Sequence, residues 1–351
     1  MTKPVTPVQI GRALIGPGQP VMVVAEIGAN FASPVEGRAM ITAAAAAGCD
    51  AVKVQTFRAD TLVRAGAMFT FEDGSHASQH DFFRARELSA DLHRNLKAHA
   101  EAHGLLFFST PSHLDDLALL EELEVAVHKI GSDDLTNLPF IRRVAETGRP
   151  VILSTGMSTL EEIGDAVECV HVTGNARLVL LHCLVGYPAP AEDVHLRVIG
   201  TLAETFGVPV GFSDHTTGIL ASTLAVALGA CLVEKHFTLD RSAGGPDNDT
   251  SLEPEEMAAM VRDIRAVPRM LGQAVKRVQP GEEKWRAAAR KSLVAARHVR
   301  AGERITEAMI AIKRPADGLP PRHLPDVVGR TAVVDIPVDT ALSWSMIQTT
   351  R

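Results

Sequence analysis

The stretch Val233-Glu234-Lys235-His236-Phe237 starts as an apolar run and continues into an acid, a base and an imidazole. Burying such groups is costly unless they are paired or bind something, so this combination needs a physical reason. Successive side chains of a strand point to opposite faces, so Glu234 and His236 share one face and Lys235 points to the other. The same arrangement, an apolar run with polar side chains near its end, recurs along the chain.

The chain contains a series of short β-rich runs, at residues 20–28, 50–57, 104–111, 125–132, 150–157, 177–184, 209–216 and 230–238. Polar side chains fall in the later part of these runs or just beyond them: Glu26, Lys53, Gln55, Ser109, Lys129, Ser132, Ser154, His182, Ser213, His215, Glu234 and His236. If the runs are parallel strands of one barrel, their C-terminal ends meet at one mouth, where active sites are built.

Helix-like segments lie between these runs, such as residues 158–170, which open with Ser158 or Thr159 as N-cap and Glu162 nearby. Strands that alternate with helices predict βαβ units and a parallel sheet. Eight such units in about 250 residues match a TIM barrel, so we predict an α/β fold of the (β/α)8 type. A doubly wound open sheet is the alternative, but no GxGxxG follows the first strand.

His215 and His236 end neighbouring strands and are predicted to approach each other. Two imidazoles with nearby carboxylates form a site for Mn²⁺, Fe²⁺ or Zn²⁺, completed by water or substrate. The alternative is a pair of hydrogen-bonded histidines near the rim. Asp214 faces away from the mouth if His215 faces in, so it is interpreted as a supporting or structural carboxylate.

Lys53 and Lys129 interrupt two of the apolar runs. Buried lysines need anionic partners, and with Ser132, Ser154 and Ser213 they would suit a phosphate and a carboxylate. The alternative is internal salt bridges, for instance from Lys53 to Glu26.

Two further loops carry candidate acids. After the fourth run, Asp133 is interpreted as a helix cap, a role that Thr136 or Asn137 could fill at least as well, and Asp134 as a candidate acid/base. In the turn-rich loop 244–251, Asp247 is either part of a plain turn or a substrate contact. The long segment 58–84 is either a lid over the mouth or a surface insertion.

Composition restricts the class of protein. The formal charge of −7 argues against a nucleic-acid partner, and no uncharged apolar run approaches the ~20 residues of a membrane span. The N-terminus does not resemble a signal peptide. The four cysteines match neither a disulfide framework nor a zinc pattern, so we expect reduced thiols and a cytoplasmic location.

The C-terminal part is predicted to form a second unit. We expect a barrel domain at 1–275, an exposed linker at 276–290 and a small β-rich domain at 291–351, built from short strands with turn signals. Arg314 stands where one of these strands meets a Pro-rich turn. It is either a surface arginine or a ligand presented to a site.

Together these motifs resemble the sialic acid synthase family, phosphoenolpyruvate-dependent enzymes that make nine-carbon keto-sugar acids. The matches, in family order, are "AEIGAN", "AVKVQTF", "KIGSDDLTNLP", "PVILSTGM", "LLHC…YPAP", "GFSDHTTG", "EKHFTLD…GPD", "RKSLVAARHVRAGERIT" and "KRPADGLPP". The resemblance implies a TIM barrel with a C-terminal antifreeze-like (SAF) domain. It also implies a domain-swapped homodimer in which the small domain of one chain closes the site of the other.

The resemblance also implies roles for particular residues. His215 and His236 are similar to ligands of a divalent ion, usually Mn²⁺, although Mg²⁺ or another divalent ion would also be compatible. Lys53, Lys129, Ser132, Ser154 and Ser213 resemble the phosphoenolpyruvate-binding set, and the two lysines are also expected to act catalytically by balancing the departing negative charge. Glu26 and Asp134 resemble catalytic acids, Asp134 falling where the family usually has Glu. Substrate contacts are expected from Gln55, Ser109, Tyr187, Glu234, Asp247 and, from the partner subunit, Arg314.

The implied reaction is a metal-dependent condensation of phosphoenolpyruvate with an open-chain aldose such as N-acetylmannosamine. The chain departs from the family pattern at Phe31, Leu184, Val185, Asn248 and Ala316. Apolar replacements remove hydrogen bonds, so the aldose acceptor is predicted to differ, and the same chemistry on a non-sialic aldehyde is one hypothesis. A hypothesis of a different class is a non-catalytic paralogue that binds a sugar or regulates a partner, and a third hypothesis is a pyruvate-dependent aldolase.

Overall fold

The computed structural model describes residues 5–348, apart from 29, 32, 71–73 and 244–246. The chain forms two compact units, 1–272 and 273–351, and each is described here by itself.

The larger unit is a closed barrel of eight parallel strands within the described chain. The strands are β3 (Met22–Glu26), β4 (Ala51–Thr56), β7 (Leu106–Pro111), β8 (His128–Ile130), β9 (Val151–Ser154), β10 (Leu178–Cys183), β11 (Val210–Asp214) and β12 (Leu232–His236). Each strand lies inside one of the apolar runs of the sequence, and β12 closes the barrel against β3. The predicted TIM barrel is confirmed.

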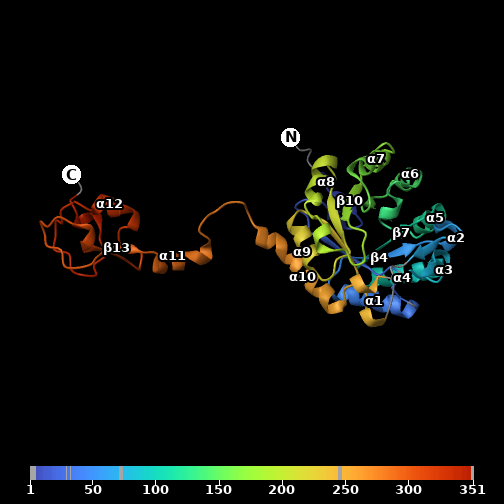
Figure 1. Cartoon of the computed structure of the whole chain (residues 1–351), viewed down its shortest axis with the longest axis horizontal. Helices are drawn as coiled ribbons and strands as arrows, with labels where there is room; N and C mark the ends of the chain where they lie inside the picture. The colour runs from blue at the N-terminus through green and yellow to red at the C-terminus, as the bar shows by residue number, and fades with distance from the viewer. Residues whose placement is uncertain (1–4, 29, 32, 71–73, 244–246, 349–351) are drawn as a thin grey trace. The chain divides into compact units, whose positions relative to one another are not determined.

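A helix follows each barrel strand, and these helices lie outside the strands (Figure 1). They are α1 (Pro34–Ala46), α4 (Ala90–Ala102), α5 (Leu114–Glu122), α6 (Leu138–Glu146), α7 (Leu160–His171), α8 (Val198–Phe206), α9 (Leu220–Ala227) and α10 (Pro254–Leu271). Helix α7 opens with a capping box in which Thr159 is the N-cap and Glu162 completes the reciprocal pair. Its start therefore follows the sequence signal.

The inner face of the barrel has two layers. Toward the N-terminal ends of the strands it is apolar, and these side chains cluster with a hairpin of β1 (Val8–Ile10) and β2 (Ala13–Ile15). The cluster contains Val8, Ile10, Ile15, Met22, Val24, Ala51, Phe108, Val127, Ile152, Val179, Leu181 and Leu232. Toward the C-terminal ends the inward positions become polar, so charge is concentrated at one end of the barrel.

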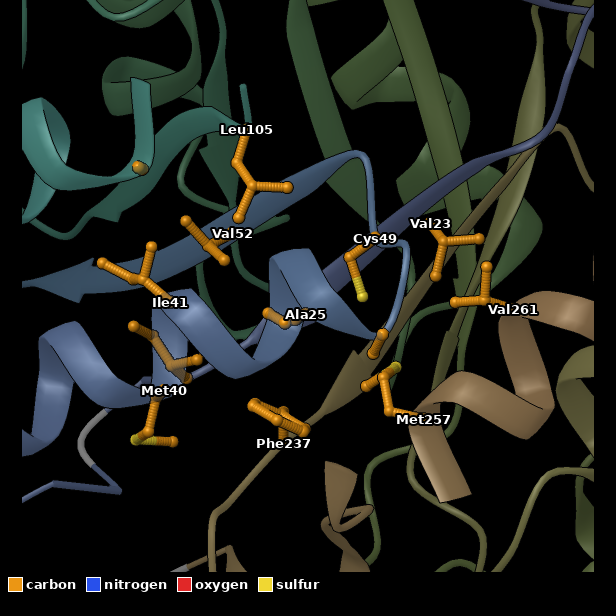
Figure 2. Close-up of a cluster of buried hydrophobic side chains, with 14 of the residues drawn as sticks. Val23, Ala25, Met40, Ile41, Cys49, Val52, Leu105, Phe237, Met257 and Val261 are labelled. Atoms are coloured by element: carbon orange, nitrogen blue, oxygen red, sulfur yellow. The ribbon is translucent and has the colours of Figure 1, made fainter. Parts of the chain in front are cut away.

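The outer face of the strands packs against the helices. Figure 2 shows part of one cluster, with Val23, Ala25, Met40, Ile41, Cys49, Val52, Leu105, Phe237, Met257 and Val261 labelled. Phe237 is fully buried among these side chains and directly follows His236. Its burial therefore anchors the end of β12 at the position where the strand delivers its imidazole to the mouth.

Residues 58–84 contain structured elements rather than a plain loop. They include α2 (Ala59–Leu62), a hairpin of β5 (Met68–Thr70) and β6 (His76–Ser78), and α3 (Gln79–Arg84); residues 71–73 lie outside the described part. Phe57, Phe82 and Phe83 make edge-to-face contacts that hold α3 against the end of β4.

The smaller unit has its own core. It contains α11 (Glu283–Ala289), an antiparallel pair of β13 (Ser292–Ala295) and β14 (Ile310–Lys313), and α12 (Leu324–Val327). Among its described residues, one hydrophobic cluster contains Leu293, Ala295, Val299, Ile305, Leu319, Val327, Ala332, Ile336, Leu342 and Ile347. This agrees with the small β-rich domain expected from the sequence.

Candidate active site

A cavity of about 270 Å³ lies at the C-terminal ends of the barrel strands. It is lined by Lys53, Gln55, Leu62, Phe83, Thr110, Ser112, Lys129, Gly131, Ser132, Asp133, Ser154, Met157, Cys183, Val185, Tyr187, Ser213, His215, Glu234 and His236. Ten of the residues selected from the sequence are among these. Period-2 alternation explains most of them, because they stand two or four residues beyond an apolar inward position of the same strand.

Lys53 lies between two carboxylates. Its Nζ is 2.5 Å from Oε2 of Glu26 and 3.9 Å from Oε2 of Glu234, and it donates to Oγ1 of Thr110 at 3.3 Å. The internal salt bridge that the sequence also allowed is therefore present. Lys53 still borders the cavity, so the ion pair and ligand binding are compatible.

Lys129 has different partners. Its Nζ donates to Oγ of Ser154 at 2.6 Å and to the carbonyl oxygen of Ile130 at 3.0 Å. None of the described carboxylates forms a salt bridge with it, although its side chain is buried. Burial lowers the pKa of Lys129, since the charged form loses its hydration. An anionic ligand in the cavity would restore the missing partner.

The two buried glutamates beside Lys53 titrate differently. Burial raises the pKa of Glu26 to about 7, an effect that Lys53 only partly offsets. Burial also acts on Glu234, but there Lys53, Lys129 and a hydrogen bond donated by Ser213 at 3.0 Å outweigh it and lower the pKa. Glu26 is therefore able to exchange a proton near neutral pH, whereas Glu234 remains a carboxylate.

His215 and His236 lie beside each other, with ring centroids 5.3 Å apart. The ring of Tyr187 is 4.3 Å from that of His215 and 5.9 Å from that of His236. Burial lowers the pKa of His215 and lowers that of His236 well below its usual value. Both rings are therefore neutral at pH 7, the form that binds metal ions.

The donor set fits a divalent ion. Nδ1 of His215 donates to the carbonyl oxygen of Leu184 at 2.8 Å, which fixes the tautomer that leaves Nε2 with a free lone pair. Nδ1 of His236 is buried without a hydrogen-bond partner in the described chain, and Oδ2 of Asp247 is 3.7 Å away. No group of three or more potential metal-binding side chains occurs among the described residues, so further ligands would come from water or substrate.

Lys235 and Asp214 point away from the cavity, as the alternation predicted. Nζ of Lys235 lies 3.3 Å from Oδ2 of Asp214, and both side chains are fully buried. Asp214 thus has the structural position expected for it from the sequence.

Five predicted site residues are not among the residues that line the cavity: Glu26, Ser109, Asp134, Asp247 and Arg314. Ser109 faces outward on β7, where its Oγ donates to the carbonyl oxygen of Val54 at 2.9 Å and contacts Oγ1 of Thr56 at 2.6 Å. The inward residue at this level is its neighbour Thr110. Once the structure shows that Phe108 faces inward, counting in steps of two leads to Thr110.

Asp133, rather than Asp134, reaches the cavity. Oδ1 of Asp134 accepts a hydrogen bond from Nδ2 of Asn137 at 2.9 Å, whereas Asp133 lines the cavity. The N-cap of α6 is Asn137, one of the alternatives that the sequence allowed, so the interpretation of Asp133 as the cap is wrong. Ser132, Asp133 and Asp134 form a single 3₁₀ turn, which rotates neighbouring side chains in different directions.

Most of the departures from the family pattern lie outside the cavity. The side chains of Phe31 and Leu184 pack against hydrophobic clusters, and Nδ2 of the buried Asn248 donates to the carbonyl oxygen of Asp240 at 3.4 Å. Ala316 belongs to the smaller unit, as does the exposed Arg314. Only Val185 among the five departures lines the cavity.

Segment 58–84 contributes Leu62 and Phe83 to the cavity, and Met157 is a further apolar lining residue. The segment therefore forms one side of the mouth. No sequence signal selected these three residues, because isolated apolar side chains are common in any loop or helix.

No helix of the described part combines the length and apolar composition needed to cross a membrane.

Comparisons with known proteins identify relatives along almost the whole chain. The NeuB family model matches residues 40–276, and the SAF domain model matches residues 290–348. The chain is 39% identical over 338 residues to the protein MJ1065 of Methanocaldococcus jannaschii, covering 96% of this chain and 97% of that one. It is 37% identical over 342 residues to N,N'-diacetyllegionaminic acid synthase of Legionella pneumophila, covering 95% and 96%.

Among solved structures, the N-acetylneuraminic acid synthetase of Leptospira borgpetersenii, in complex with citrate, superposes with a TM-score of 0.73 at 31% identity. The match covers 80% of this chain and 95% of that one.

Proposed function

This chain belongs to the NeuB family, and from that membership we propose that it condenses phosphoenolpyruvate with an open-chain aldose to give a nonulosonic, sialic-type acid and phosphate. It is an enzyme, a transferase that forms a carbon–carbon bond. The observation that carries the proposal is one cavity that contains two buried lysines, a set of serines and two neutral histidines.

The lysines are proposed to bind the two anionic groups of phosphoenolpyruvate. Lys129 carries a buried ammonium whose described partners are only a hydroxyl and a carbonyl oxygen, so a phosphate or carboxylate would offset its desolvation. Ser132, Ser154 and Ser213 border the same cavity and can donate hydrogen bonds to oxygen atoms of the ligand.

His215 and His236 are proposed to hold a divalent ion, Mn²⁺ in the first instance. When bound, such an ion acts as a Lewis acid that polarises the aldehyde carbonyl of the aldose. The protein keeps both imidazoles neutral by burial and fixes the tautomer of His215 through Leu184.

In the proposed reaction, formation of the carbon–carbon bond is followed by hydration of C2 and loss of phosphate. C3 of phosphoenolpyruvate forms the new bond to the aldehyde carbon, and the aldehyde oxygen gains a proton. Water adds to the cationic C2 and gives up a proton to a carboxylate. The bond from C2 to the phosphate oxygen then breaks, phosphate leaves with the electron pair, and the C2 hydroxyl loses its proton to become the ketone. Glu26, with a pKa of about 7, is suited to accept and return protons.

The decisive experiment measures phosphate release from phosphoenolpyruvate with Mn²⁺ and a panel of aldoses, including N-acetylmannosamine. We expect release that depends on both aldose and metal and that stops with a chelator. No turnover with any aldose, while metal and phosphoenolpyruvate still bind, would leave a sugar-binding protein. Condensation with pyruvate itself, without phosphate, would indicate an aldolase.

We propose that the group of the acceptor aldose that lies against Val185 is less polar than a hydroxyl of N-acetylmannosamine. An apolar side chain cannot donate to or accept from a sugar hydroxyl, so an acceptor that needs such a bond is disfavoured. Val185→Ser is expected to shift kcat/KM toward N-acetylmannosamine by about 10-fold relative to the preferred aldose. An unchanged ratio would assign no selectivity to this position.

We further propose a homodimer in which Arg314 of one copy completes the cavity of another. The sequence from residue 273 onward carries 14 Lys and Arg against 8 Asp and Glu, a formal +6, which leaves −13 for the rest of a chain whose total is −7. Opposite charges favour docking of the small unit on a barrel. Mixing Arg314→Ala with Lys53→Met should restore part of the activity that each variant lacks. No recovery in confirmed mixed dimers would contradict the exchange.

A cytoplasmic location is proposed because all four cysteines are buried and free. Thiols that stay reduced are typical of the cytosol. Fractionation of the native host cells, with an antibody to the protein, would test this.

A further inference from the structure

A fully buried ion pair stands behind the two histidines. Asp214 on β11 and Lys235 on β12 are register partners, and their side chains have exposed fractions of 0%. Each directly precedes one of the imidazoles, since Asp214 is followed by His215 and Lys235 by His236. The pair therefore joins the two strand ends on the face opposite the cavity.

Further hydrogen bonds complete the pair. Oδ1 of Asp214 accepts from the backbone nitrogen and from Oγ1 of Thr216, both at 2.8 Å. Oδ2 accepts from Oγ of the buried Ser222 on α9 at 2.6 Å. Lys235 donates to the carbonyl oxygen of Thr216. The two peptide units that follow His215 are thus held by this cluster.

The cavity side of the same strands has a matching connection. Ser213 donates to Glu234 at 3.0 Å, one residue before the buried pair on each strand. The strands are therefore joined on both faces at the level from which the histidines project. Asp214 and Lys235 lie on the outer face, away from the cavity, so they have no direct part in the chemistry.

A contribution to stability alone does not explain why Asp214 and Lys235 form a buried ion pair on the outer face of the strands. Removing two charges from water costs several kcal/mol per ion, and apolar residues of similar size are often as stable or more so. What charged and hydrogen-bonding groups add is direction, because their contacts are satisfied in one geometry only. A metal site needs such direction, since the groups behind the ligands set their orientation.

We propose that Asp214 and Lys235 are positioning residues that fix the ends of β11 and β12 so that His215 and His236 face one divalent ion. This inference rests on the proposed metal site. It assigns to the outer face of the two strands a role in metal affinity, distinct from the substrate contacts of the inner face.

The test replaces the pair by apolar residues, Asp214→Leu with Lys235→Met, so that no unpaired charge stays buried. The probe is Mn²⁺ alone, measured by titration with electron paramagnetic resonance on the full chain. We expect a folded protein, judged by circular dichroism and Tm, whose Mn²⁺ affinity is about 10- to 100-fold weaker. A folded double variant with unchanged Mn²⁺ affinity would overturn the proposal.

Two further variants distinguish a positioning effect from a general loss of stability. Ser222→Ala removes one hydrogen bond to Asp214 and should weaken Mn²⁺ binding several-fold, which keeps the test valid if the double variant does not fold. Asn175→Ala is the control, because Asn175 is buried and donates to the carbonyl oxygens of Ala145 and Arg149 far from the histidine cluster. It should lower Tm without changing Mn²⁺ affinity. Equal losses of affinity in Asn175→Ala would reduce the effect to general destabilisation and overturn the proposal.

A second readout does not depend on the ion. The ¹⁵N resonances of the two imidazoles report their tautomers and surroundings in the protein without metal. We expect them to shift or broaden in Ser222→Ala and in the double variant but not in Asn175→Ala. If the wild-type protein binds no Mn²⁺, the proposed metal site fails, whereas unchanged imidazole resonances in the folded variants would refute the positioning role itself.

Discussion

The lower and upper layers of the barrel interior use the same strands for opposite purposes. Near the N-terminal strand ends, side chains such as Val24, Phe108 and Leu232 pack with the β1–β2 hairpin and bury apolar surface. Two residues further along the same strands stand Glu26, Thr110 and Glu234, around a buried cluster of charges. Burial of apolar surface in the lower layer stabilises the folded state. Burial of charge in the upper layer offsets part of that stabilisation.

This difference indicates where the molecule tolerates change. Loss of a lower-layer side chain should reduce stability and leave turnover per folded molecule intact. Loss of an upper-layer side chain should reduce turnover and leave the free energy of unfolding intact. Variants in the two layers can therefore test that division.

The largest effect is expected from Lys129→Met. The variant removes the cation proposed to bind an anionic group of phosphoenolpyruvate, so kcat/KM should fall by about 10³-fold. The free energy of unfolding should stay equal or rise, because a buried ammonium without a carboxylate partner is removed. Steady-state kinetics measures kcat/KM, and urea unfolding measures the free energy of unfolding. A large loss of stability with normal turnover would reverse the assignment of the upper layer.

The counterpart in the lower layer is Ile10→Ala. Ile10 is fully buried at the N-terminal end of the barrel, so truncation should cost about 2–5 kcal/mol of unfolding free energy. Turnover per folded molecule should not change. Thermal unfolding and active-site titration check both quantities, and a specific loss of kcat would show that the layers are coupled.

Neighbouring residues of β7 sharpen the comparison. Thr110→Val removes a hydroxyl that accepts from Lys53, and kcat/KM should fall about 10-fold with little change in stability. Ser109→Ala, one position away but facing outward, should cost about 1–2 kcal/mol of stability and leave kcat/KM unchanged. The reverse outcome would mean that Ser109 rather than Thr110 serves the cavity.

The smallest expected effect is the contribution of His93, on α4, to the pH dependence of stability. His93 is buried, and burial lowers its pKa, so the unfolded chain binds more protons below the ordinary histidine pKa of about 6.5. Stability should therefore fall as pH drops from 7 to 5. In His93→Gln this fall should be smaller by up to about 1 kcal/mol. Urea unfolding at several pH values measures it, and an identical slope would show that folding does not lower the pKa of His93.

Much of the fold followed from local patterns. Each barrel strand lies within an apolar run, and the Thr159 capping box starts α7 where the sequence indicated. The alternation of Glu234, Lys235 and His236 was also predicted, because side-chain direction in a strand depends only on period 2.

The sequence by itself determined the strands, the change from apolar to polar along them, and the motifs of the NeuB family. The tertiary structure alone decided which of two adjacent polar residues turns inward, as for Ser109 and Thr110 or Asp133 and Asp134. It also decided that Val185 faces the cavity while Leu184 packs against a core cluster. The reason is physical. Which side of a strand or turn faces the barrel axis is set when the strands close on each other, and the identities of the neighbouring residues do not determine it.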